Sequence, residues 1–200
     1  MFKIGQNRGF MKKEYRNAAR TKKMIRNAFT ELLGEKKSME TITATELAEK
    51  ADISKSTFYN HYENIYEVFE EFENEIIEEL SKVLDEIERD QATEYDAYIK
   101  KVMDFLKGKE DLYRKVIFSP DIKFFIDKLK VTISKKVFAE SVVLPFSSNK
   151  AVRYVQIRFL TNACVDTVVD YFKGLFDMTL DEVGEIIIRF LEESKVKVVQ

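Results

Sequence analysis

The sequence predicts an all-α protein, because of its turn content, its hydrophobic spacing and its helix-start signals. Only 2 of its 200 residues are Pro and 6 are Gly, so it has few of the tight turns that a β-sandwich or β-barrel needs. Apolar residues recur at three- and four-residue spacing along most of the chain, which indicates helices that bury one face. Thr or Asn followed three residues later by Glu marks several helix starts. We therefore expect long helices with short connections.

The first helix is expected at about residues 18–33, where one apolar stripe can be buried. That stripe consists of Ile25, Ala28, Phe29, Leu32 and Leu33. Gly34 follows and ends the helix. Residues 1–17 lack such a stripe and carry five Lys or Arg residues, so we expect them to form a flexible basic arm.

Two short helices are predicted next. Thr43 and Glu46 form a capping box that starts the second helix. Asp52 ends it, since Asp tolerates the left-handed backbone better than most residues. Ser54 then caps a third helix, which we expect over residues 55–62.

The remaining helices follow from the same periodicity. Asn64 and Glu67 form a capping-type pair at the start of a long helix at about 65–89. Thr179 and Glu182 cap the last helix of the chain. Between these two, helices are expected at about 94–107, 109–118, 120–139 and 149–173.

Composition argues against several classes of function. One Cys excludes an intrachain disulfide and multi-Cys metal sites, and one His excludes most zinc enzymes. No Gly-rich phosphate loop or Ser-His-Asp set is visible. No apolar run reaches the ~18 residues that span a bilayer, and the N-terminus lacks a secretory signal. We expect a soluble cytoplasmic protein that is not an enzyme, with no catalytic residues, metal, cofactor or membrane contact.

The charge is unevenly distributed. Residues 1–62 hold 13 basic and 7 acidic residues, a net charge of +6, whereas residues 63–200 have a net charge of −8. A basic first third on an acidic remainder indicates a polyanionic partner for the first part only.

Residues 43–62 predict a helix-turn-helix, in which two short helices are joined by a tight turn. The latter of these two helices, at residues 55–62, has about eight residues and would be ~12 Å long, which suits a major groove about 12 Å wide. Phe58 is expected in the core. The outward residues carry donors and acceptors for base edges and phosphates: Lys55, Ser56, Thr57, Tyr59 and Asn60.

Residues 18–70 resemble the N-terminal domain of the TetR (tetracycline-repressor-like) transcriptional regulators. The resemblance is carried by the run TATELAEKADISKSTFYNHYENIYEVF, preceded by RTKKMIRNAFTELL. It implies a DNA-binding domain at 18–63, with an effector-binding and dimerisation domain at 64–200. It also implies a homodimer on a palindromic operator in double-stranded DNA, with repression as the default outcome.

The resemblance also implies roles for individual residues. Thr43 and Thr45 would contact phosphate from the start of the second helix. Tyr59 and His61 would touch the DNA backbone, and Lys22 of the first helix would contact phosphate. Lys55, Ser56, Thr57 and Asn60 would face the groove. The alternatives are a packing role for His61 and a solvated helix face for Lys22.

Two positions depart from the family pattern. Asp52 replaces the usual Gly of the turn, and Ile65 replaces a Lys that usually contacts phosphate. DNA affinity would then depend more on the basic arm, residues 1–17. Ile65 also keeps open an alternative function, a co-activator or adaptor of the same fold that works mainly through a protein partner. A helical enzyme is a further alternative, but no motif supports it.

The second part of the chain is rich in aromatic residues, which could surround a small hydrophobic effector or simply form a core. The candidate pocket residues are Tyr95, Tyr98, Phe105, Tyr113, Phe125 and Phe159. The last two helices are apolar on more than one face, which predicts an isologous homodimer interface. Its candidate residues are Val155, Phe159, Val169, Ile187, Phe190 and Leu191.

Overall fold

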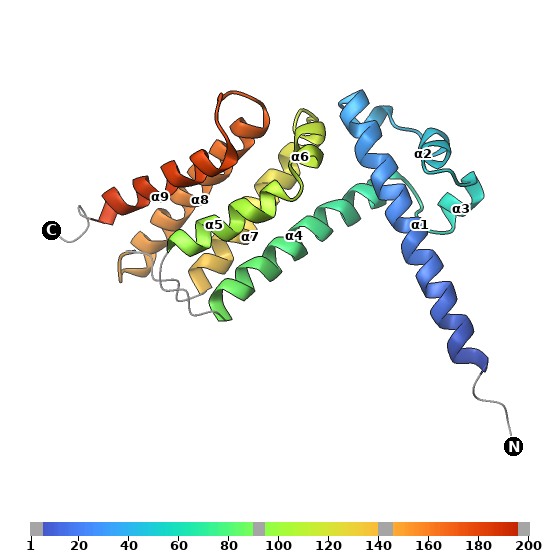
Figure 1. The fold of residues 1–200 in the computed structure, drawn as a ribbon, viewed down its shortest axis with the longest axis horizontal. Helices are drawn as coiled ribbons and strands as arrows, with labels where there is room; N and C mark the ends of the chain where they lie inside the picture. Colours follow the sequence, from blue (N-terminus) through green and yellow to red (C-terminus); the bar gives the residue numbers. More distant parts are fainter. Residues whose placement is uncertain (1–5, 90–94, 140–145, 196–200) are drawn as a thin grey trace, which may run out of the picture. The chain divides into compact units, whose positions relative to one another are not determined.

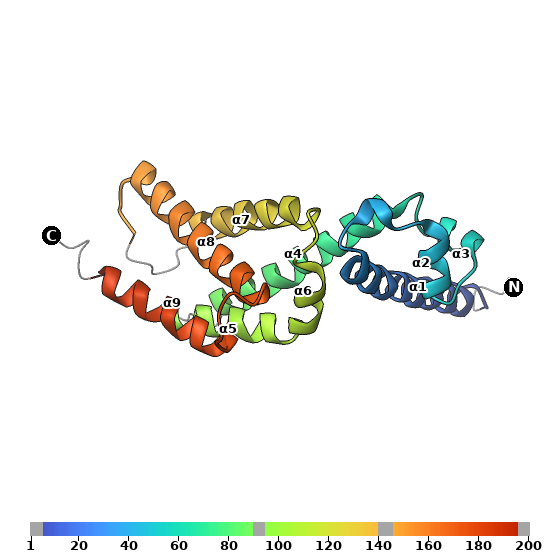
Figure 2. The ribbon, with the colours of Figure 1, turned by 90° about the horizontal axis from the view of Figure 1, so that it is seen from above.

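The computed structural model describes residues 6–89, 95–139 and 146–195 (Figures 1 and 2). These residues form nine α-helices and one short 3-10 helix, η1, and include no strand, which confirms the predicted all-α class. Over the same ranges, no helix is both long enough and apolar enough to cross a membrane. The chain divides into two compact units, unit 1 (Met1–Glu73) and unit 2 (Asn74–Gln200), and the division falls inside one helix, α4.

Unit 1 consists of short helices gathered around the long helix α1. Its elements are α1 (Gln6–Lys36), η1 (Met39–Thr41), α2 (Ala44–Lys50), α3 (Lys55–Tyr59) and the first part of α4 (Ile65–Arg89). Its fully buried side chains come from all four helices: Ile25, Phe29, Leu33, Leu47, Phe58 and Val68. The ring centroid of Phe29 lies 6.1 Å from that of Phe69 and 6.4 Å from that of Phe72. The predicted stripe of the first helix is therefore buried against α4.

The first helix starts earlier than predicted. It begins at Gln6, so the expectation of a flexible arm is wrong for residues 6–17, and residues 1–5 lie outside the described residues. Most residues of this stretch, such as Met11, Lys12 and Lys13, favour helix. A helix that is nucleated in its packed part extends without needing further apolar contacts.

The turn between α2 and α3 follows the prediction. Thr43 caps α2 with a complete capping box, and Asp52 has a φ of 55°. The α3 helix, however, ends at Tyr59 and does not reach residue 62. The carbonyl of Phe58 accepts hydrogen bonds from the N–H groups of both His61 and Tyr62, at 2.9 and 3.0 Å. The chain thus leaves the helix while the Tyr62 ring stays packed 6.0 Å from the Phe58 ring.

Unit 2 contains the rest of α4 and five further helices. They are α5 (Tyr95–Lys107), α6 (Glu110–Val116), α7 (Ile122–Ala139), α8 (Lys150–Phe172) and α9 (Leu180–Lys195). Helix α7 packs on α8, and α9 packs on both α5 and α8 (Figures 1 and 2). Gly184 permits the approach of α5 to α9, because a Cβ there would lie 2.9 Å from Cγ of Met103. All these helices start and end within a few residues of the prediction.

Candidate nucleic-acid interface

The short helix α3 turns most of its polar side chains outward. Phe58 is 0% exposed, whereas the next residue, Tyr59, is 50% exposed. The ammonium of Lys55 lies 6.0 Å from the centroid of the Tyr59 ring, so these two side chains flank each other. Ser56 and Asn60 are exposed as well. The structure therefore exposes four of the residues predicted to point outward, three of them on α3 and the fourth, Asn60, at its C-terminal cap.

Two predicted contact residues, Thr57 and His61, are less exposed and form hydrogen bonds within the protein. The N–H of Thr57 donates to Oγ of Ser54 at 3.0 Å, and the two hydroxyls lie 2.8 Å apart. Thr57 is therefore part of the helix cap, and its side chain is half-buried. His61 is half-buried beyond the end of α3, where its N–H bonds to Phe58.

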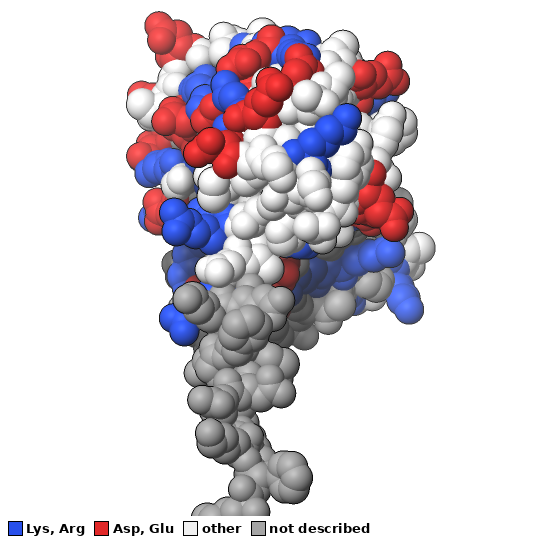
Figure 3. Space-filling model, turned by 90° about the vertical axis from the view of Figure 1, so that its right-hand side faces the viewer, with Lys and Arg blue, Asp and Glu red and all other residues white. Residues whose placement is uncertain are grey.

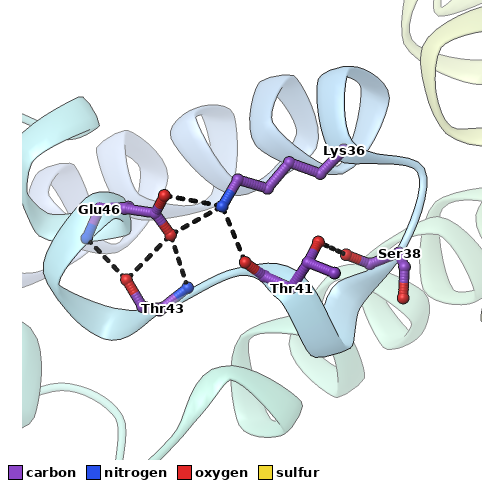
Figure 4. Close-up of polar contacts among 5 residues, drawn as sticks. All are labelled: Lys36, Ser38, Thr41, Thr43 and Glu46. Atoms are coloured by element: carbon purple, nitrogen blue, oxygen red, sulfur yellow. Dashed lines mark hydrogen bonds and ion pairs between the residues drawn. The ribbon is translucent and has the colours of Figure 1, made fainter.

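A polar cluster closes the start of α2 (Figure 4). Lys36, at the end of α1, donates to Oε1 and Oε2 of Glu46 at 2.7 and 2.8 Å and to the carbonyl of Thr41 at 2.8 Å. Glu46 also accepts from the N–H and hydroxyl of Thr43, at 3.1 and 2.9 Å. Both donors of Thr43 therefore already have a carboxylate partner, and a phosphate there would have to displace it. Thr45, in the first turn of α2, is exposed.

This cluster predicts a pH-dependent contribution to stability. The hydrogen bond from Lys36, followed by the two from Thr43, lowers the pKa of Glu46 from 4.5 to about 2. A depressed carboxyl pKa stabilises the fold above the unfolded value, and this stabilisation is lost as the pH falls through the folded value. A Glu46→Gln variant, which keeps a capping side chain, should melt below the wild type at pH 7. The difference should shrink as the pH falls from 4.5 to about 2.

Thermal unfolding followed by circular dichroism checks this expectation. The control is Glu40→Gln, which removes an exposed carboxylate in η1 and should produce no such pH-dependent difference. Equal melting temperatures of the wild type and Glu46→Gln at pH 7 would contradict the stabilising role of the cluster.

The basic side chains of α1 are not all turned to solvent. Lys22 forms an ion pair with Glu71 of α4, whereas Arg20 and Lys23 are exposed. Figure 3 looks at the side of unit 1 that carries α2 and α3: acidic and basic side chains intermingle in its upper part, and the area below is mostly uncharged with charged side chains at its edges. The outward side chains of α3 belong to residues 53–62, a stretch of the sequence that contains no carboxylate.

The predicted effector residues of unit 2 are placed differently from one another. Tyr113 and Phe125 are buried, and Tyr98 and Phe105 pack around the buried residues Leu80 and Leu84. Phe159, which was also predicted for the effector pocket, is 66% exposed. Tyr95 begins α5, and its side chain lies outside the described part of the structure.

The predicted dimer residues also divide into two groups. Val155, Phe159 and Phe190 are exposed, and Val169 is half-buried. Ile187 and Leu191 are buried within their own unit. They lie one turn apart on the side of α9 that covers unit 2, whereas Phe190 lies on its outer side.

Two exposed aliphatic residues on these helices were missed by the sequence prediction of the interface. They are Val152 on α8 and Ile186 on α9. Helical spacing could have identified both, because they lie three residues before Val155 and four before Phe190. No family model matches the chain, and no curated protein matches it either.

Proposed function

We propose that the protein is a sequence-specific DNA-binding transcriptional regulator with α3 as its recognition helix. The observation that supports this most directly is the amphipathic character of α3. Phe58 anchors the helix in the core, while Lys55, Ser56, Tyr59 and Asn60 are exposed. Ammonium, hydroxyl and amide groups are those that recognise base edges and phosphates. The resemblance of residues 18–70 to TetR regulators supports the same function, with repression as its outcome.

The proposal includes a homodimer that forms through α8 and α9. Their outer faces share exposed apolar residues, which are Val152, Val155, Phe159, Ile186 and Phe190. An exposed apolar face of this kind favours a protein partner. A second copy would place two helices from each chain in a four-helix arrangement with two-fold symmetry. Two α3 helices about 34–36 Å apart would then reach successive major grooves of a palindromic site.

A small hydrophobic effector in unit 2 also belongs to the proposal. The Tyr113 side chain is buried, and its hydroxyl has no hydrogen-bond partner among the described residues. Buried polar groups normally have a partner, so this hydroxyl is available to a ligand with one polar group. A ligand that prefers one dimer arrangement would change the DNA affinity.

Selection of bound sequences from random duplex DNA tests the proposed function. We expect enrichment of an inverted repeat, and a binding constant that falls steeply with salt because phosphate contacts release counterions. The double variant Lys55→Ala/Tyr59→Ala should lose at least about tenfold in affinity for the enriched duplex. Binding can be measured by fluorescence anisotropy with a labelled duplex.

The matched control is Lys123→Ala/Phe124→Ala on α7. It removes the same charge from unit 2 and an aromatic ring that is 80% exposed, against 50% for Tyr59, and it should bind the enriched duplex like the wild type. If no sequence is enriched, or if the α3 double variant binds normally, the assignment of α3 is wrong.

One observation favours a second candidate, an adaptor that works through a protein partner. At the start of α4, Ile65 is half-buried and Tyr66 is exposed. An apolar residue beside an exposed aromatic ring suits a protein surface better than phosphate. In that case the selection would enrich no duplex, and a Tyr66→Ala variant would weaken binding to the protein partner.

A further inference from the structure

Glu71 of α4 joins two basic side chains of α1 inside unit 1. Its Oε2 lies 2.6 Å from Nζ of Lys22, and its Oε1 lies 2.6 Å from a guanidinium nitrogen of Arg26. The two cations lie one turn apart on α1, so a single carboxylate engages both, with one oxygen for each. Both ion pairs are partly buried, which sets them apart from fully solvated surface pairs of little energetic value.

Lys22 has a second neighbour, the ring of Tyr62 that follows α3. The ammonium lies 4.9 Å from the ring centroid, within the range of a cation–π contact. Tyr62 is only 3% exposed, and its ring packs against that of Phe58. Contacts therefore run without a gap from Glu71 through Lys22 and Tyr62 to Phe58, the residue that anchors α3 in the core.

The ionisation of these groups agrees with their close packing. Burial and the nearby charge of Glu71 raise the pKa of the Tyr62 hydroxyl. Burial raises the pKa of Glu71, but the hydrogen bond from Lys22 and the charges of Lys22 and Arg26 contribute to a net decrease. Glu71 is thus a carboxylate at neutral pH, as an ion pair with Lys22 requires.

We propose that Glu71 and Lys22 are positioning residues for α3. Glu71 holds the Lys22 ammonium over the Tyr62 ring. The Tyr62 ring packs on Phe58 and so holds the segment that follows α3 against the core. The Lys22 ammonium then interacts with groups inside unit 1 and does not contact phosphate. This inference rests on the proposed function only in taking α3 as the helix that reads DNA.

The sign of the effect of Glu71→Gln distinguishes positioning from phosphate binding. If Lys22 contacted phosphate, neutralising Glu71 would free it and tighten binding to any duplex. If Lys22 positions α3, the same variant should bind the duplex enriched by the wild type about tenfold more weakly. It should bind a scrambled duplex of equal length as well as the wild type does, or better.

Three further variants complete the binding experiment. Lys22→Met should also lose about tenfold on the enriched duplex, and Lys22→Met/Glu71→Gln should lose no more than either single variant, because both changes break the same connection. The control is Glu70→Gln, the same charge change at the exposed neighbouring residue, which should behave like the wild type. Tighter binding of Glu71→Gln to both duplexes would overturn the inference.

Hydrogen exchange of the free protein tests the same inference without DNA. The amides of Asn60, His61 and Tyr62 bond to carbonyls within α3. In Glu71→Gln and Lys22→Met these amides should exchange at least about tenfold faster, whereas Glu70→Gln leaves them unchanged. Lys22→Arg, which can keep the ion pair and the ring contact, should restore wild-type exchange.

The two readouts separate this inference from the proposed function. If the wild type enriches no duplex but exchange at residues 60–62 responds as expected, the DNA-binding proposal fails and the positioning role stands. Unchanged exchange in both Glu71→Gln and Lys22→Met, in variants that melt cooperatively, overturns the positioning role whether or not DNA binds.

Discussion

Under the proposed function, a Phe159→Glu variant is expected to be a monomer that binds the enriched duplex only weakly. Phe159 is 66% exposed on the apolar face of α8 and α9. In an isologous interface each residue is present twice, so the variant would bury two carboxylates without partners, at a cost of several kcal/mol. Sedimentation over a range of concentrations measures the mass. The affinity for the enriched duplex should fall at least about 100-fold, because a monomer contacts only one half-site.

Phe124→Glu is the matched control for this change. Phe124 is 80% exposed on α7 and is not part of α8 or α9, so its replacement should leave both the mass and the DNA affinity of the wild type. A dimer of unchanged stability in Phe159→Glu would show that this face does not hold the subunits together.

Phe58→Ala is expected to destabilise unit 1 by about 3–5 kcal/mol, the usual range for a buried Phe. Phe58 is fully buried, and its ring packs against the rings of Tyr59 and Tyr62. Denaturant unfolding followed by circular dichroism measures the loss. The variant should also lose DNA binding at temperatures where the wild type still binds.

The neighbouring residue provides the control. Tyr59→Ala removes a ring that is half-exposed and should lower stability by only about 1 kcal/mol, the value of one aromatic pair, yet it should weaken DNA binding. If Phe58→Ala proves as stable as Tyr59→Ala, Phe58 does not anchor α3 as described.

Sequence predicts helix starts well where capping residues are explicit. Thr43 with Glu46 and Thr179 with Glu182 form the expected hydrogen bonds, and Asn64 accepts from the N–H of Glu67 at 3.1 Å. Such signals are local, since each pair lies within one turn. The left-handed backbone at Asp52 was predictable for the same reason.

Two errors in unit 1 arise where the sequence lacks a hydrophobic pattern or where the packing is not local. Residues 6–17 carry no apolar stripe, so nothing in the pattern indicated that α1 extends through them. Tyr62 has the spacing of a helical residue relative to Phe58, but it reaches the core from the loop after α3. Hydrophobic spacing alone does not distinguish these two routes to burial.

The candidate site was predictable only in part. That Lys55, Ser56, Tyr59 and Asn60 would be exposed followed from their places around Phe58. The caps at Thr43 and Ser54 were predicted, but they use the hydroxyls of Thr43 and Thr57 for which DNA contacts were also expected, because capping and ligand binding use the same groups. The partner of Lys22 lies 49 residues away, a separation at which sequence spacing carries no signal.

The division between the two units within α4 has a consequence for engineering. An exchange of unit 2 for another domain has no loop in which to place the junction, because Glu73 and Asn74 are consecutive residues of one helix. Each residue inserted there would rotate the downstream helix by about 100° and lengthen it by about 1.5 Å. A working chimaera must therefore be spliced in helical phase, and junctions shifted by a whole number of turns should be tolerated best.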